Sequence, residues 1–238
     1  MAMMASTCDD PSQPRNLTSI TKLDFEANYL SGTIPPELGR LYNLRNLMLC
    51  SNQFTGRLPT ALGQLGNLTN FRISENNFSG PIPEFIQNWR QLARLEMVAS
   101  GLTGLIPLNI SLFTSLNDLR IGEMTGPSQP IPPLNNATAL IKLILRNCNI
   151  MEKYRIIFGK CMNSNGCDDA SFNNLVGRIS NNILGRSLRY VFLTDNELSG
   201  DIPNNLLIIG AAIDLSYNNF TWQGPNQHYY KTVFVFQT

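Results

Sequence analysis

The chain has 238 residues, of which 43% are hydrophobic and 15% are charged, with a formal net charge of +1. This balance gives no electrostatic case for binding nucleic acid or an anionic membrane. His228 is the only histidine, so enzyme mechanisms that need two histidines are excluded.

A repeat of 24 residues occupies the first third of the chain. The segment 20–35 recurs at 44–59 and again at 68–83, each time with the pattern LxxLxLxxNxLxGxIP or a close variant of it. The asparagines in this pattern are Asn28, Asn52 and Asn76. Repetition at a fixed period of 20 to 50 residues is typical of solenoid proteins.

The repeat continues through the rest of the chain with substitutions and changes of length. Three further repeats keep the 24-residue step but carry another residue at the asparagine position: Ser100, Met124 and Cys148. Asparagine then returns in the same frame at Asn173, Asn196 and Asn218. About nine repeats therefore share one frame, and this frame identifies a leucine-rich-repeat array.

Each position of the repeat has a physical role. The alternating apolar residues point inward from a short strand, and the residues between them face solvent. An asparagine side chain can bond backbone groups that the following bend leaves unpaired, so stacked repeats form an asparagine ladder. The ladder residues predicted here are Asn28, Asn52, Asn76, Asn173, Asn196 and Asn218.

The predicted fold is an α/β leucine-rich-repeat solenoid. We expect a right-handed, curved stack of coils with a parallel concave sheet, and with turns and short 3₁₀ pieces on the convex side. The solenoid covers residues 17–222 and is irregular at 151–170. Residues 1–16 are an N-terminal remnant without a complete cap, and residues 223–238 form a divergent tail.

The extended motif indicates which class of leucine-rich repeat the chain resembles. Leu30-Ser-Gly-Thr-Ile-Pro-Pro-Glu-Leu-Gly-Arg-Leu41 resembles the plant extracellular class of leucine-rich repeats. The segments that begin at Asn88, Leu119, Leu145 and Ile213 resemble the ectodomains of plant receptor-like serine/threonine kinases, in the group whose repeats precede a malectin-like domain. The resemblance implies a plasma-membrane glycoprotein whose extracellular repeats bind a protein, peptide or glycan ligand and a co-receptor.

The chain differs from that family in several features, so three hypotheses about its function remain. The chain has no glycine-rich phosphate loop, His-Arg-Asp motif or Asp-Phe-Gly motif, so we expect a truncated ectodomain without catalytic activity. A stand-alone secreted inhibitor of cell-wall-degrading enzymes and a non-functional gene product are the other hypotheses. Our first interpretation of residues 151–170 is that they are foreign sequence. The alternative is a loop closed by a Cys161–Cys167 disulfide. Residues 223–238, the tail, are open to the same interpretation as foreign sequence.

The solvent-facing strand positions are the candidate binding surface. Arg72, Glu96 and Arg120 occupy one column with alternating charge, which indicates either a surface ion ladder or a recognition strip. Exposed aromatic residues later in the chain, Phe172 among them, are plausible anchors for a partner or a sugar ring. The predicted ligand-binding residues are Arg72, Arg94, Glu96, Arg120, Glu123, Arg146, Tyr190, Phe192 and Tyr217.

The remaining chemistry is limited. An exported chain could carry N-glycans at Asn16, Asn67, Asn77, Asn109, Asn136 and Asn219. Five cysteines without a CxxC pair predict no metal site, and no cofactor is expected. We expect Cys148 to be buried and Cys50 to lie on the exposed face of the sheet.

Targeting signals are also missing from the printed sequence. No apolar run approaches the roughly 18 residues that a membrane-spanning helix needs. Residues 1–14 lack the basic start and the apolar stretch of a secretory signal. We therefore expect no membrane insertion by this chain.

Overall fold

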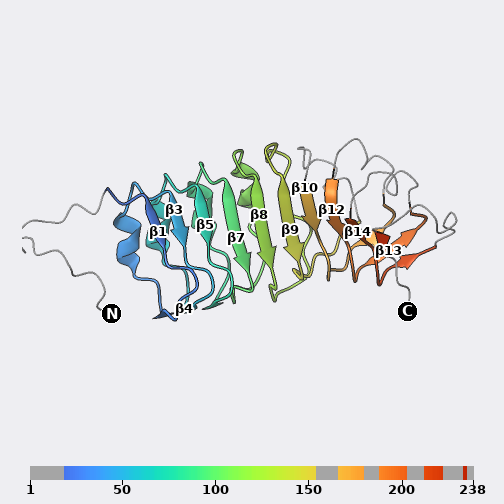
Figure 1. The fold of residues 1–238 in the computed structure, drawn as a ribbon, viewed down its shortest axis with the longest axis horizontal. Coiled ribbons are helices and arrows are strands. Elements are labelled where there is room, and N and C mark those ends of the chain that lie inside the picture. Colours follow the sequence, from blue (N-terminus) through green and yellow to red (C-terminus); the bar gives the residue numbers. More distant parts are fainter. Residues whose placement is uncertain (1–18, 154–165, 180–187, 203–211, 222–232, 235–238) are drawn as a thin grey trace, which may run out of the picture.

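A computed structural model describes residues 19–153, 166–179, 188–202, 212–221 and 233–234. Its centre is a ten-stranded parallel sheet whose strands follow one another in chain order along the long axis of the molecule (Figure 1). The strands of this sheet are β1 (Lys22–Asp24), β3 (Asn46–Met48), β5 (Asn70–Arg72), β7 (Arg94–Val98), β8 (Asp118–Gly122), β9 (Lys142–Arg146), β10 (Gly166–Asp169), β12 (Leu188–Phe192), β14 (Ala212–Asp214) and β16 (Val233–Phe234). The leucine-rich-repeat fold is confirmed.

Two smaller parallel sheets lie after the bend of each repeat. One contains β2 (Ser31–Gly32), β4 (Gln53–Gly56) and β6 (Asn77–Phe78), and the other contains β11 (Val176–Gly177), β13 (Glu197–Gly200) and β15 (Asn219–Phe220). The repeat glycine at this bend has a positive φ in most coils, for example 76° at Gly56, where a side chain would be strained. This requirement explains why the repeat keeps a glycine there.

The return segments contain short 3₁₀ helices and, within the described ranges, no long helix. They are η2 (Pro36–Arg40), η3 (Thr60–Gln64), η4 (Glu84–Asn88) and η5 (Leu108–Leu112). Each begins directly after the proline of the repeat, whose extended backbone (φ between −61° and −74°) starts the turn. The expected 3₁₀ pieces are therefore confirmed.

The helices within the described ranges are all too short or too polar to cross a membrane.

In the core, inward-pointing side chains that occupy the same position of successive repeats form a row along the solenoid. The second residues of the first six strands of the ten-stranded sheet are in register and at most 9% exposed. They are Leu23, Leu47, Phe71, Leu95, Leu119 and Leu143. Trp89 adds a buried ring 4.7 Å from that of Phe71, and its indole N–H donates to the carbonyl of Leu62 at 3.0 Å. The burial of these side chains holds the coils together.

The asparagine side chains join each coil to the one before it. Asn76 Nδ2 donates to the carbonyls of Ile73 and Ser74 in its own bend and of Leu49 in the preceding coil, at 3.0–3.1 Å. Its Oδ1 accepts the N–H of Phe54 at 3.0 Å. Asn52, Asn173, Asn196 and Asn218 repeat this arrangement. The side chain of Asn28, in the first coil, is exposed and, among the described residues, donates to the carbonyls of Phe25 and Glu26 in its own bend.

A glutamine outside the repeat pattern makes hydrogen bonds to two coils that lack the asparagine. Gln129 is 5% exposed, accepts the N–H of Ile106 at 2.8 Å and donates to the carbonyl of Cys148 at 2.9 Å. Cys148 is buried, as predicted, and its Sγ lies 3.5 Å from the carbonyl oxygen of Ile121. Sequence reasoning missed Gln129 because it lies five residues after Met124, the residue in the asparagine position.

The irregular segment contributes a strand to the sheet, with a shift of register against β12 between Gly166 and Cys167. β10 pairs in parallel with β9 and with β12, so the sheet continues through residues 166–169. Asp168 lies between Leu143 and Val191 in the inward row and is 0% exposed. A carboxyl group therefore replaces the apolar side chain in this row, and the cost of burying its charge raises its pKa to about 8.

The structure contradicts two expectations about cysteines, the Cys161–Cys167 disulfide and the exposed position of Cys50. Cys167 is a free thiol, so the Cys161–Cys167 disulfide is absent; Cys161 itself lies outside the described residues. The prediction that Cys50 is exposed is wrong: it is 6% exposed, because its thiol lies beside Glu26 of the preceding coil and the backbone of Ser74 in the next, and burial raises the pKa of this thiol to about 12. β16 comes from the predicted tail, so the sheet extends one strand beyond the nine repeats.

Candidate functional site

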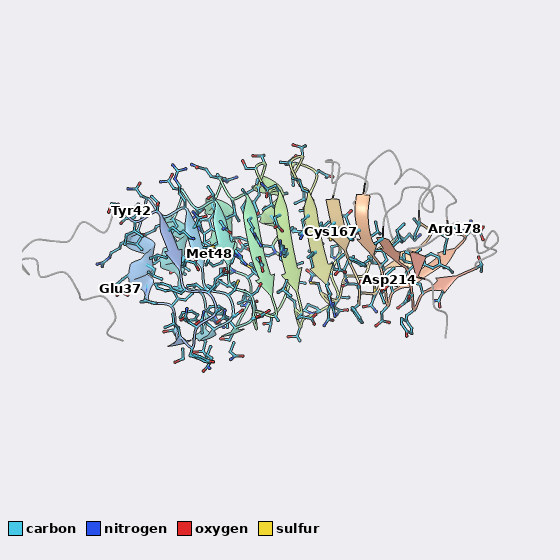
Figure 2. All side chains as sticks on the ribbon, in the orientation of Figure 1. Glu37, Tyr42, Met48, Cys167, Arg178 and Asp214 are labelled. Carbon is cyan, nitrogen blue, oxygen red and sulfur yellow. The ribbon has the colours of Figure 1, made fainter. Side chains whose placement is uncertain are left out.

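The outward-pointing side chains of the ten-stranded sheet form the open face. Its middle column runs in register from Asp24 through Met48, Arg72, Glu96, Arg120, Ile144, Asp169 and Phe192 to Asp214. Figure 2 labels three open-face residues, Met48, Cys167 and Asp214, at successive points along the sheet. Adjacent strands are about 4.8 Å apart, so neighbouring members of the column are in reach of one another.

Glu96 is the centre of an ion-pair network on β5, β7 and β8. Its Oε2 atom lies 3.0 Å from Arg72 Nε, 2.7 Å from Arg94 Nη2 and 3.8 Å from Arg120 Nη1. The side chain of Glu96 is only 11% exposed. Burial opposes its ionisation, but the hydrogen bond from Arg94 and the charges of Arg72 and Arg120 outweigh burial and lower its pKa.

Two further carboxylates complete what we call the Glu96 network. Arg72 Nη1 lies 3.0 Å from Glu26 Oε2, two strands away, and Arg120 Nη2 lies 2.8 Å from Asp118 Oδ2 on its own strand. Arg94 Nε is 3.4 Å from Asp118 Oδ2, an ion pair without a good hydrogen bond. Three arginines therefore face three carboxylates, and the charges compensate one another locally.

A smaller group lies where β9 ends. Arg146 Nε is 3.3 Å from Glu123 Oε1, and the guanidinium carbon is 4.6 Å from the ring centroid of Phe172. Asn147 donates a short hydrogen bond to the other oxygen of Glu123. Glu123, Asn147, Phe172 and Tyr217 all occupy the left-handed position before the ladder residue, with φ between 48° and 60°. This conformation places these residues along the edge of the open face.

Tyr190 and Phe192 form an aromatic pair on β12. Their ring centroids are 6.3 Å apart with an interplanar angle of 24°. Tyr190 is 46% exposed and Phe192 is half-buried. The predicted ligand-binding residues thus form the Glu96 network, the Arg146–Glu123 pair at the edge of the face, and a second zone around the aromatic pair. Tyr217, 52% exposed, stands at the edge of the second zone.

Two open-face carboxylates were not among the predicted site residues. Asp169 Oδ1 accepts the N–H of Ser171 at 3.0 Å, and Asp214 Oδ1 accepts both the N–H and the hydroxyl of Ser216. The shared Asp-x-Ser spacing in the sequence is the signal that could have revealed them. Asp169 and its neighbour Asp168 both lie in β10, with Asp168 pointing inward and Asp169 outward.

The candidate glycosylation sites differ in accessibility. Asn77, Asn136 and Asn219 are exposed, and Asn67 and Asn109 are half-buried. The Nδ2 atom of Asn67, to which a glycan would be attached, donates to the carbonyl of Tyr42 at 2.9 Å. Asn16 lies outside the described residues.

The described residues contain no group of three or more histidine, cysteine, aspartate and glutamate side chains that could hold a metal ion.

The comparisons with known proteins agree with this architecture. A family model for leucine-rich repeats matches residues 19–41, 43–65 and 67–89. A probable LRR receptor-like serine/threonine-protein kinase of Arabidopsis thaliana, At1g53440, is 41% identical over 100 residues. The match covers 42% of this chain and 10% of the kinase. The chain is therefore homologous to plant leucine-rich-repeat receptor-like kinases and corresponds to a small part of their length.

Solved receptor structures match a larger share of the chain. The plant peptide hormone receptor RGFR1, in complex with RGF2, superposes with a TM-score of 0.77 at 29% identity, over 85% of this chain and 33% of the receptor. The Arabidopsis receptor kinase HAESA, in complex with the peptide hormone IDA and the co-receptor SERK1, superposes with a TM-score of 0.60 at 28% identity. That match covers 86% of this chain and 30% of HAESA. The chain thus resembles part of the repeat region of plant receptor kinases that were solved in complex with peptide hormones.

Proposed function

We propose that this chain is part of the ectodomain of a plant receptor-like serine/threonine kinase, and that its open face binds a secreted peptide. The resemblance to peptide-hormone receptors supports this assignment. In this proposal the leucine-rich-repeat solenoid is the one recognition domain, and the catalytic step belongs to a kinase part that these 238 residues do not include.

The observation that carries the proposal is the open face itself. Side chains that point outward from the sheet stay partly accessible along its length, from Asp24 (42% exposed) through Arg94 (30%) to Arg146 (48%). They include charged, amide and aromatic groups at a regular spacing set by the strands. An extended peptide lying across such strands could meet one row of side chains after another.

Location and assembly follow from the same proposal. We propose that the region is extracellular in the parent protein, that it is glycosylated at some of its sequons, and that a co-receptor ectodomain joins the ligand-bound complex. The subgroup with a malectin-like domain after the repeats remains our proposed parent. Binding would bring two kinase domains together and so pass a signal across the membrane.

The test is a peptide screen with a matched pair of variants. The chain is secreted from insect cells behind a leader sequence, immobilised and exposed to a library of synthetic plant-secreted peptides, and retained peptides are identified by mass spectrometry. Affinity is then measured for two variants. Ile144→Arg changes a half-buried residue at the centre of the open face, and Leu108→Arg changes a 65%-exposed residue on η5.

We expect Ile144→Arg to weaken peptide binding at least tenfold and Leu108→Arg to leave it unchanged. Circular dichroism and thermal unfolding would check that both variants fold. The proposal fails if no peptide is retained, or if the two substitutions have equal effects on affinity.

A further inference from the structure

We propose that Asp169, Phe192 and Asp214 form an arginine cradle, in which a ligand peptide places one arginine side chain on the Phe192 ring between the two carboxylates. This inference rests on the proposed function, since it names a feature of the peptide that the open face would select. It concerns the second zone of the face and not the Glu96 network.

The register of the sheet builds the cradle. Phe192 is paired directly with Asp169 on one side and with Asp214 on the other, so the three side chains lie in one row across β10, β12 and β14. With adjacent strands about 4.8 Å apart, the two carboxylates are separated by roughly 10 Å, one on each side of the ring. All three side chains are half-buried, with part of their surface accessible.

Both carboxylates are held in the same orientation. In each, Oδ1 accepts the N–H of the serine two residues later, at 3.0 Å. No hydrogen bond within the described residues uses Oδ2 of either aspartate, so that oxygen can accept from a ligand. Because the backbone contact already fixes the side chain, binding would cost little additional conformational freedom.

The charges at the cradle differ from those of the Glu96 network. Glu26, Glu96 and Asp118 each lie within 4 Å of an arginine. Within the described ranges, neither Asp169 nor Asp214 has an ion pair. The cradle therefore presents two carboxylates that make no ion pair among the described residues, beside an aromatic platform, which is a complementary environment for a cation.

The shape selects a guanidinium over other groups. A guanidinium is planar, stacks on aromatic rings and carries donors on opposite edges, so it can lie on Phe192 and reach both carboxylates. A lysine ammonium is a compact point charge that can approach only one carboxylate closely. Tyr190 lies next along β12 between the small residues Cys167 and Ala212, and it extends the platform for the apolar stem of the arginine.

The experiment compares blocked tripeptides that differ at one position. Acetyl-Gly-Arg-Gly-amide, its lysine counterpart and its citrulline counterpart are titrated into the full chain, and binding is followed by saturation-transfer NMR. Citrulline has nearly the shape of arginine but no charge. We expect the arginine peptide to bind at least tenfold more tightly than the citrulline peptide and measurably more tightly than the lysine peptide.

Two aspartate variants locate the binding. The double substitution Asp169→Asn and Asp214→Asn keeps an oxygen for the serine N–H, and we expect it to reduce arginine-peptide affinity at least tenfold. Asp24→Asn is the matched control, because Asp24 occupies the same column in β1 and accepts the N–H of Glu26 in the same way. It should leave the affinity unchanged. Phe192→Leu, which removes the platform without changing charge, should also weaken binding.

Equal binding of the arginine and citrulline peptides, absence of binding by any of them, or equal effects of the cradle and Asp24 substitutions would overturn the inference. Preferential binding of cello-oligosaccharides at the aromatic pair, with no response to arginine, would overturn it as well. These outcomes leave the peptide screen of the proposed function intact, because that screen does not depend on arginine content. Failure of the screen alone would instead remove the receptor assignment.

Discussion

The first five repeats and the repeats after residue 166 use the same strand and the same ladder, but they treat polar groups differently. In the first region every open-face carboxylate of the Glu96 network pairs with an arginine, and the inward row is entirely apolar. In the second region Asp169 and Asp214 have no ion pair within the described residues, and Asp168 puts a carboxyl group into the core.

We propose that this difference separates the repeats that support the fold from the repeats that recognise a ligand. Compensated charges stiffen a surface but give a ligand little to bind, since each new contact must displace an existing one. Unpaired carboxylates and exposed aromatic rings leave their interactions for a partner. In our proposal, the N-terminal repeats are a support, and the C-terminal repeats are the part of the face that selects a ligand.

The largest expected effect concerns Asp168. Its folded-state pKa, about 8, lies above the value of 3.8 for an unperturbed aspartate, so the native state holds a proton that the unfolded chain releases. The contribution of Asp168 to stability is therefore greatest below about pH 4, falls by about 1.4 kcal/mol per pH unit as the pH rises toward 8, and then levels off. Asp168→Leu should remove this slope and stabilise the C-terminal repeats by roughly 4 kcal/mol at pH 7.

Hydrogen exchange measured between pH 5 and 8 checks this prediction. After correction for the intrinsic exchange rate, protection of strands β9, β10 and β12 should fall with pH in the wild type and stay constant in the variant. Protection of β1, β3 and β5 should stay constant in both proteins. A pH-independent β10 in the wild type would contradict the buried, unpaired carboxyl group.

The next effect concerns the asparagine ladder. Asn76→Ala leaves the carbonyls of Leu49, Ile73 and Ser74 and the N–H of Phe54 without this partner, so we expect it to reduce the free energy of unfolding by roughly 1–3 kcal/mol. Asn77→Ala changes the exposed neighbour of the same residue type and should stay within about 0.5 kcal/mol of wild type. Urea unfolding of both variants makes the comparison, and equal stabilities would show that the ladder is not what joins the coils.

A smaller effect is expected in the Glu96 network. Because its arginines lower the pKa of Glu96, the stabilising ion pairs are complete above the ordinary glutamate pKa and are lost as the pH falls through the lowered value. Glu96→Gln should cost about 1 kcal/mol at pH 7 and low salt, and less at high salt. Glu37→Gln, at an exposed position of η2, is the matched control and should change neither stability nor salt dependence.

The smallest effect on the fold concerns glycosylation in the two regions. When the chain is secreted from plant cells, we expect Asn77 and Asn219 to carry glycans at higher occupancy than Asn67, whose amide nitrogen is already bonded to the carbonyl of Tyr42. Glycopeptide mass spectrometry measures the occupancy of each site. Higher occupancy at Asn67 than at the two exposed sites would show that this hydrogen bond does not limit access.

The repeat period alone determined which residues point inward and which point outward. Stacking of equal coils requires the alternating aliphatic residues to face the core, so the strand positions, the ladder and the open-face column from Asp24 to Ile144 could all be derived from the sequence. No knowledge of side-chain contacts was needed for these assignments.

Only the tertiary structure decided which polar groups meet. Gln129 joins two coils from outside the repeat pattern, Cys50 is covered by groups of the neighbouring coils, and Phe192 lies between Asp169 and Asp214. These pairings depend on unequal coil lengths and on side-chain rotamers in neighbouring coils, which a period in one sequence does not encode. Backbone periodicity sets the direction of a side chain, whereas its contacts are set by the packing of the coils on either side.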